Sequence, residues 1–152
     1  MIQRIQSIFL FAAFCFMVSL FFATTASLVT LDGEIYDFRL TGFYQTYQDA
    51  TERVIRQVSL TLYGCLICGL NVITIFMYKR RVLQMRLCIY NIILIVGIMG
   101  LLMFIIHNVK RVDTVVYHLP VVFPAASAIL HYLAYRSIRR DDLMVQALSR
   151  LR

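Results

Sequence analysis

The sequence predicts an all-α membrane protein: a bundle of four transmembrane helices, with a small β-hairpin in the first outer loop and a cytosolic amphipathic tail at the C-terminus. Three observations support this prediction. Of the 152 residues, 61% are hydrophobic and 15% are charged, which is outside the range of soluble globular domains. Long apolar stretches without charged residues recur along the chain. Basic residues gather in alternate connections between these stretches.

Each apolar stretch is long enough to cross a bilayer. A hydrocarbon layer of ~30 Å needs ~20 apolar residues in a helix, and each span must satisfy its own backbone hydrogen bonds. The first stretch also resembles a signal peptide, because Arg4 precedes it and small residues follow it, but its length favours a permanent helix. The prediction is therefore a single membrane domain, residues 1–152, with spans at about 5–28, 57–78, 87–106 and 117–135.

The distribution of charge predicts the orientation. The side with both termini has 10 basic and 2 acidic residues, a net charge of +8, whereas the other side has 5 basic and 6 acidic residues, a net charge of −1. Because basic connections stay in the cytosol, both termini are expected there. This topology accounts for most of the net charge of +7, so no nucleic-acid partner is expected.

Only the first outer connection is long enough to have structure of its own. Asp32-Gly33 lies between two β-prone runs and suits a type I′ turn, which predicts a hairpin over about 28–41. An isolated hairpin is marginal in water, so it should lie on the bundle or pair with another chain. Farther along, Asp49 and Glu52 have the spacing of a capping box, which predicts that the second helix begins there, before the bilayer.

Three polar residues lie within the predicted spans at similar depth: Asn71, Asn91 and His131. Polar side chains in hydrocarbon are candidates for function, and here they are consistent with a pocket for a ligand or an ion. The alternative is hydrogen bonding between helices, worth ~0.6 kcal/mol on average. We favour this alternative, because the layer contains no acidic residue or lysine to bind or relay a charge.

Cysteines and histidines suggest a redox or cofactor-binding protein. Cys65 and Cys68 form a CxxC motif like that of the thiol:quinone oxidoreductases, which are also small membrane proteins. The motif lies near the predicted bilayer centre, and the chain lacks a second pair in an outer loop. His107 and His118, at the ends of neighbouring predicted spans, are consistent with haem ligands, although histidines are common at membrane interfaces. We therefore expect no cofactor and no enzymatic activity, with the oxidoreductase as the alternative.

The C-terminal tail, residues 136–152, is predicted to form an amphipathic helix. Met144, Leu148 and Leu151 share one face at helical spacing. Such a helix would continue the last span, lie on anionic lipid or fill a groove on another protein. Because Asp141 and Asp142 offset the neighbouring arginines, we favour a protein partner over lipid alone.

Three stretches, MIQRIQ, YKRRVLQMRLCIYN and IRRDDLMVQALSRLR, resemble signatures of a small, uncharacterised four-helix membrane family of Bacteroidota. The resemblance follows the whole chain in order, although Ser149 stands where the family pattern has an acidic residue. It implies a location in the bacterial inner membrane and no known activity. The matching positions are Gln3, Arg4, Gln84, Arg86, Cys88, Asn91, Arg139, Asp141, Arg150, Leu151 and Arg152.

These stretches all belong to the predicted cytosolic face, which favours a docking surface there. The sequence therefore predicts a non-enzymatic accessory or scaffold subunit of a larger inner-membrane complex, in contact with the bilayer and with other membrane or cytosolic proteins. The predicted docking residues are Gln3, Arg4, Gln84, Arg86, Arg139, Arg140, Asp141, Asp142, Arg150 and Arg152.

Overall fold

The structure is a computed structural model of residues 1–152. It describes the backbone of the chain apart from residues 1, 31–33, 48–49, 110–111 and 151–152. Side chains are described except in those segments and at residues 2–5, 46–47, 50–54, 79, 112 and 146–150.

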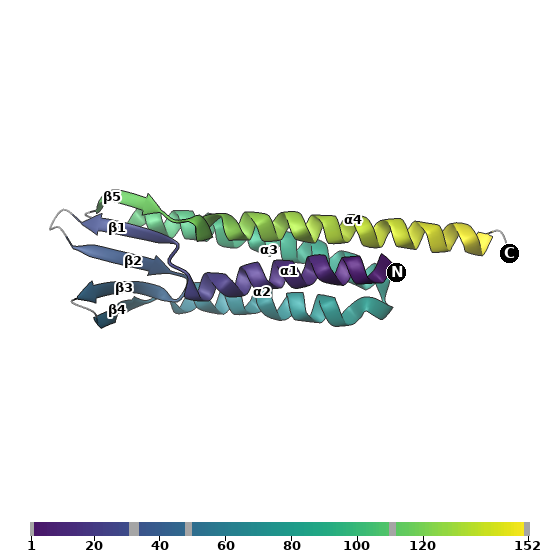
Figure 1. Ribbon diagram of the computed structural model, residues 1–152, viewed down its shortest axis with the longest axis horizontal. Coiled ribbons are helices and arrows are strands. Elements are labelled where there is room, and N and C mark those ends of the chain that lie inside the picture. Colours follow the sequence, from purple (N-terminus) through teal and green to yellow (C-terminus); the bar gives the residue numbers. More distant parts are fainter. Residues whose placement is uncertain (1, 31–33, 48–49, 110–111, 151–152) are drawn as a thin grey trace.

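The molecule is elongated, with a sheet at one end of a helical bundle (Figure 1). The N-terminus, the α2–α3 connection and the C-terminus lie at the other end, the basic end. Single 3-10 turns, Met77–Lys79 and Leu119–Val122, precede the last two helices. In chain order the elements are α1 Ile2–Phe22, β1 Ala26–Thr30, β2 Ile35–Arg39, β3 Gly42–Tyr47, β4 Ala50–Arg56, α2 Val58–Phe76, α3 Arg81–Asn108, β5 Val112–Tyr117 and α4 Phe123–Arg150.

The strands form one antiparallel sheet in the order β4-β3-β2-β1-β5. The hairpin connection between β2 and β3 is only two residues long, because Arg39 pairs directly with Gly42. Gly42 has a φ of 149°, and a Cβ there would lie 2.2 Å from the carbonyl oxygen of Ile55. A glycine is therefore needed for β4 to pair closely with β3.

One hydrophobic core joins the sheet to the helices. Phe38 and Leu40 are fully buried together with Leu20 of α1 and Leu60 of α2. The cluster continues along the bundle to Ile95 of α3. The sheet is thus packed onto the ends of the helices. This packing stabilises strands that would be only marginally stable as an isolated hairpin in water.

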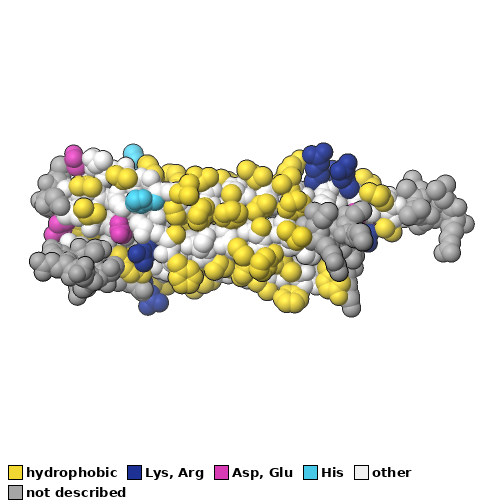
Figure 2. Space-filling view, viewed as in Figure 1, with side chains coloured by type: hydrophobic (Ala, Val, Ile, Leu, Met, Phe, Trp, Pro, Cys, Tyr) yellow, Lys and Arg dark blue, Asp and Glu magenta, His cyan; other side chains and the backbone are white. Residues whose placement is uncertain are grey.

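The helices form a ring in which α1 and α3 each contact both α2 and α4. Their outer surfaces are apolar, and Figure 2 shows hydrophobic side chains along the middle of the molecule. Exposed examples are Phe11 on α1, Ile73 on α2, and Ile93 and Phe104 on α3. An apolar exterior of this extent is typical of a surface that meets lipid or another protein.

Within the described residues, only α2 and α3 are long and apolar enough to cross a membrane. Just 28% of the most apolar window of each is buried inside the protein. A helix in the core of a soluble protein would have most of this window buried. Their composition and exposure associate the protein with a membrane.

The predicted all-α bundle of four transmembrane helices is wrong. The sheet begins inside the first predicted span, 5–28, because Ala26–Thr30 is β1, and it reaches the first residue of the last predicted span, 117–135, because Val112–Tyr117 is β5. The apolar part of α1 therefore ends at Phe22, and α4 begins only at Phe123 and reaches its first arginine at Arg136. Both apolar segments are shorter than the ~20 residues that a span needs.

The predicted start of the second helix is also wrong. Residues Ala50–Arg56 form β4, and α2 begins at Val58. Glu52 pairs with Gln45 across the sheet instead of capping a helix, while Asp49 lies outside the described residues. The predicted hairpin over 28–41 corresponds to β1 and β2, but its turn residues Asp32 and Gly33 are outside the description.

Candidate functional site

Exposed arginines surround the basic end of the molecule. Arg80 and Arg86 flank the start of α3, and Arg136, Arg139 and Arg140 follow one another on α4. Figure 2 shows Lys and Arg side chains gathered where the apolar surface ends. The opposite end carries both acidic and basic side chains (Figure 2). The basic end is therefore the part of the described surface with the strongest single-sign charge.

Two of the predicted docking residues are inside the bundle. The Gln84 side chain is 3% exposed, and its Nε2 donates to the backbone oxygen of Thr74 at 3.2 Å. Asp141 is 7% exposed, and its Oδ2 accepts a hydrogen bond from Gln6 of α1. These side chains hold helices together and do not form part of an exposed docking surface.

The Gln6–Asp141 contact joins residues from the two ends of the chain. Arg81 adds a long hydrogen bond, 3.5 Å, from its guanidinium to the backbone oxygen of Asp141. Elements α1, α3 and α4 therefore meet at this point. Sequence reasoning missed Gln6, because nothing local to α1 indicates a partner that is 135 positions away in the sequence.

The remaining predicted docking residues fall into three groups. Arg86, Arg139 and Arg140 are exposed. Asp142 is partly exposed and is engaged in an interaction. Gln3, Arg4, Arg150 and Arg152 lie outside the residues whose side chains are described.

The last part of α4 extends beyond the other helices (Figure 1). Leu143, Met144 and Val145 on this extension are each about half exposed, at 55%, 53% and 49%. Of the predicted apolar stripe, Met144 is thus placed at the surface, while Leu148 and Leu151 are outside the described side chains. The described side chains of the extension are thus mainly apolar, and the Gln6–Asp141 contact fixes its base to the bundle.

The three polar residues predicted within the spans are all fully buried. Asn91 and His131 lie at one level, because each is three residues from a member of one packed cluster, Cys88 and Ala134 respectively, on antiparallel helices. Asn91 also donates to Thr74 Oγ1 at 3.2 Å, and Asn71 is one turn from Thr74 on α2. The structure therefore brings the three residues into one layer of the bundle interior.

Hydrogen bonds within this layer join pairs of helices. The Asn91–Thr74 bond connects α3 to α2, and the Ser127 hydroxyl donates to the backbone oxygen of Ala13, 3.2 Å away, which connects α4 to α1. His131 Nδ1 lies 2.9 Å from the Ser127 carbonyl oxygen. Both polar atoms of Asn71, Asn91 Oδ1 and His131 Nε2 have no hydrogen-bond partner within the described residues.

The cysteines of the CxxC motif lie on the outer side of α2. Cys65 is exposed and Cys68 is partly exposed, and both are free thiols. The other two are separated from them and from each other, because Cys15 is exposed on α1 and Cys88 is buried on α3. The described structure thus contains one adjacent pair of thiols and no relay to a second pair.

The two histidines of the haem hypothesis are separated by a strand. His107 is near the end of α3, whereas His118 follows β5. The His118 Nε2 lies 2.8 Å from the Ser27 hydroxyl, which in turn donates to Asp37 at 2.7 Å. In a catalytic triad the carboxylate accepts a hydrogen bond from the histidine, but here the Asp37 carboxylate accepts one from Ser27. This chain of contacts ties β1, β2 and the start of α4 together.

The described residues contain no group of three or more His, Cys, Asp or Glu side chains arranged to hold a metal ion. The fold and its functional surfaces thus define a class of protein: an apolar helical bundle, capped by a sheet at one end and surrounded by arginines at the other. The chain belongs to a family described as a domain of unknown function, DUF4293, whose model matches residues 2–151. This match confirms the resemblance to an uncharacterised family, over nearly the whole chain, and does not bear on a Bacteroidota origin. No curated protein matches the chain.

Proposed function

We propose that the protein is a non-enzymatic scaffold or accessory subunit of a complex in the bacterial inner membrane. Helices α2 and α3 are the full-length spans, α1 and α4 run beside them between the same two sides with shorter apolar segments, and both termini face the cytosol. The distribution of charge supports this orientation, because the basic end would stay on the cytosolic side. The sheet then lies on the outer side of the membrane.

The observation that carries the proposal is the extension of α4 beyond the bundle. Its exposed Leu143, Met144 and Val145 follow the exposed Arg139, which lies just before the base of the extension. Amphipathic helices that present apolar and basic groups bind into grooves on partner proteins. Since the Gln6–Asp141 contact already holds the base of this segment, less conformational entropy is lost when a partner binds.

Cross-linking from the extension tests the proposal. A photo-cross-linking amino acid replaces Met144 in full-length protein within its native membrane, and a matched variant carries it at Ile129, which is 61% exposed on the apolar part of α4. We expect a discrete protein adduct from position 144 and none from position 129. A version that ends at Asp142 keeps the Gln6–Asp141 contact and should lose co-purification of the same partner. Adducts with lipid alone from position 144 would exclude a docking role for the extension.

The redox alternative rests on one observation, the exposure of two thiols one turn apart on α2. As a thiol:quinone oxidoreductase the protein would purify with bound quinone, and as a haem protein it would show a Soret absorption band. The scaffold predicts neither. A protein purified in mild detergent and examined by absorption spectroscopy and solvent extraction separates the two classes.

A further inference from the structure

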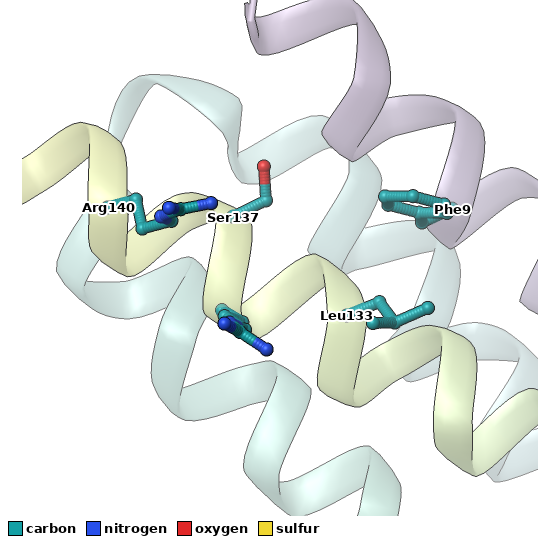
Figure 3. Close-up of a pocket in the computed structure, with 5 residues that line it drawn as sticks. Phe9, Leu133, Ser137 and Arg140 are labelled. Carbon is teal, nitrogen blue, oxygen red and sulfur yellow. The ribbon is translucent and has the colours of Figure 1, made fainter.

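A cavity opens between α1 and α4 at the basic end. Its volume is ≈ 380 Å³, within the ~300–1,000 Å³ of small-molecule sites. The described residues that line it are Phe9, Leu133, Arg136, Ser137 and Arg140. Figure 3 shows Phe9 on one helix facing the part of α4 that carries the other labelled residues.

The polar half of this cavity suits a phosphate group. Arg136 and Arg140 are four residues apart on one helix, so they project from the same face. A guanidinium binds phosphate through parallel N–H donors, and two of them one turn apart offer more donors than one phosphate needs. The hydroxyl of Ser137 supplies a further donor between them.

The apolar half of the cavity lies toward the middle of the bundle. Leu133 precedes Arg136 by one turn toward the apolar part of α4, and Phe9 faces it from α1. The cavity therefore changes from apolar to cationic along the molecular axis, at the level where the apolar surface of the molecule ends (Figure 2). A lipid has the same order of groups, with acyl chains below its phosphate.

The neighbouring acidic residues do not oppose an anion here. Among the described residues no carboxylate lines the cavity, and the Asp141 side chain is buried against Gln6. From the sequence, the aspartates appear to offset the arginines of the tail. In the structure, Asp141 instead accepts an internal hydrogen bond, and Arg136 and Arg140 remain at the surface.

A second cavity of similar chemistry lies at the same end. Its volume is ≈ 340 Å³, and its lining residues are Arg80, Val82, Leu83 and Arg86. It again combines two arginines with aliphatic side chains at the start of α3. Because the two cavities belong to different helices, the pairing of arginines with apolar groups recurs at this level of the molecule.

We infer that the α1–α4 cavity is a binding site for an anionic phospholipid. Arg136, Arg140 and Ser137 hold the phosphate, and an acyl chain lies along Leu133 and Phe9. The inference takes its location in a bilayer from the proposed function but is separate from partner docking, which uses the exposed face of the α4 extension.

Native mass spectrometry of the full-length protein tests the inference. The detergent-solubilised protein is titrated with phosphatidylglycerol or with phosphatidylcholine, which share acyl chains but differ in net charge. We expect phosphatidylglycerol to bind with about tenfold higher affinity, and the R136Q/R140Q variant to lose about tenfold of that affinity. The control R56Q/R139Q removes the same number of charges from exposed positions that do not line the cavity and should change affinity by less than about twofold.

Equal binding of the two lipids to the wild-type protein, or an equal loss in both variants, would overturn the inference. A third titration with inorganic phosphate distinguishes the source of the anion. If phosphate displaces the lipid at equal concentration, the site is one for a free anion and the lipid assignment is wrong.

A photoactivatable phosphatidylglycerol gives a second measurement that needs no variant. It should label the α1 and α4 peptides that contain Phe9 and Leu133, and labelling confined to other peptides would also contradict the site. If both lipid tests succeed while position 144 gives no protein adduct, partner docking fails and the lipid site stands.

Discussion

Two glycines on α2 show how single residues determine the packing of the helices. A Cβ on Gly64 would lie 2.7 Å from Leu40 Cδ2 and 2.9 Å from Phe21 Cζ, whereas a Cβ on Gly69 meets nothing within 4 Å. Gly64→Ala should therefore destabilise the protein by about 1–3 kcal/mol, because the core must shift to accept it. Gly69→Ala should leave stability unchanged or raise it by up to about 1 kcal/mol, because alanine favours a helix.

Reversible unfolding in mixed micelles of SDS and a mild detergent measures the two free energies. Both variants replace a glycine by an alanine within one helix, so the difference reports contact with Leu40 and Phe21. Equal stabilities would show that the turn after β2 does not pack closely on α2.

At the same scale, the thiols of α2 distinguish the two candidate functions. If the protein is a scaffold, the double variant Cys65→Ala, Cys68→Ala should keep the partner adduct formed from position 144 at its wild-type yield, because small apolar residues fill both positions equally well. The yield is read from anti-tag blots of cross-linked membranes. Loss of the adduct in a variant that still folds would indicate that the thiols take part in function.

At the scale of the elements, the contact between Gln6 and Asp141 joins the part of α4 at the basic end to the start of α1. The bond is buried and one partner is a carboxylate, so a double-mutant cycle with Gln6→Ala and Asp141→Ala should give a coupling of about 1.5–3 kcal/mol. A parallel cycle with Gln6→Ala and Arg139→Ala should give about zero, because Arg139 is exposed. In the single variant Asp141→Ala, amide hydrogen exchange should be faster than in the wild-type protein in the part of α4 beyond Ile138. A coupling near zero for the first pair would mean that the Gln6–Asp141 contact does not help to hold the two helices together.

The elements also show how far the sequence predicts this fold. Apolar stretches correctly located the interiors of α2 and α3, and the two β-prone runs on either side of Asp32-Gly33 correctly indicated the pair of strands β1 and β2. The sequence does not predict the other three strands. Ala50–Arg56 falls where the capping-box spacing predicts the start of the second helix, and Val112–Tyr117 falls in the short second outer connection. The pairing of β5 with β1 is a long-range contact that no local pattern encodes.

Only part of the candidate site could be predicted, because contacts between residues far apart in the sequence are again not encoded by local patterns. Local composition is enough to identify the arginines and the depth of Asn71, Asn91 and His131. It does not show that Gln84 and Asp141 turn inward, because their partners, Thr74 and Gln6, come from other helices. The lipid cavity likewise depends on Phe9 of α1 facing α4, which only the assembled bundle shows.

The whole molecule places its sheet and its basic end on opposite sides of the apolar bundle (Figure 1). The charges of the sequence divide in the same way, with a net +8 on the side predicted to be cytosolic and −1 on the side predicted to be outside. Moving clustered basic residues across a membrane is opposed during insertion, so the basic end should remain cytosolic. Labelling of single cysteines in a cysteine-free background tests this orientation.

Thr114→Cys reports the sheet end and Arg139→Cys reports the basic end, since both positions are exposed. A membrane-impermeant maleimide should label position 114 in intact spheroplasts and position 139 only after lysis. The reverse pattern would place the α4 extension outside the cell, where cytosolic partners could not reach it. Labelling of both positions in intact spheroplasts, with a cytosolic marker still protected, would mean that the bundle does not separate two compartments. The apolar surface would then have to be covered by protein instead of lipid.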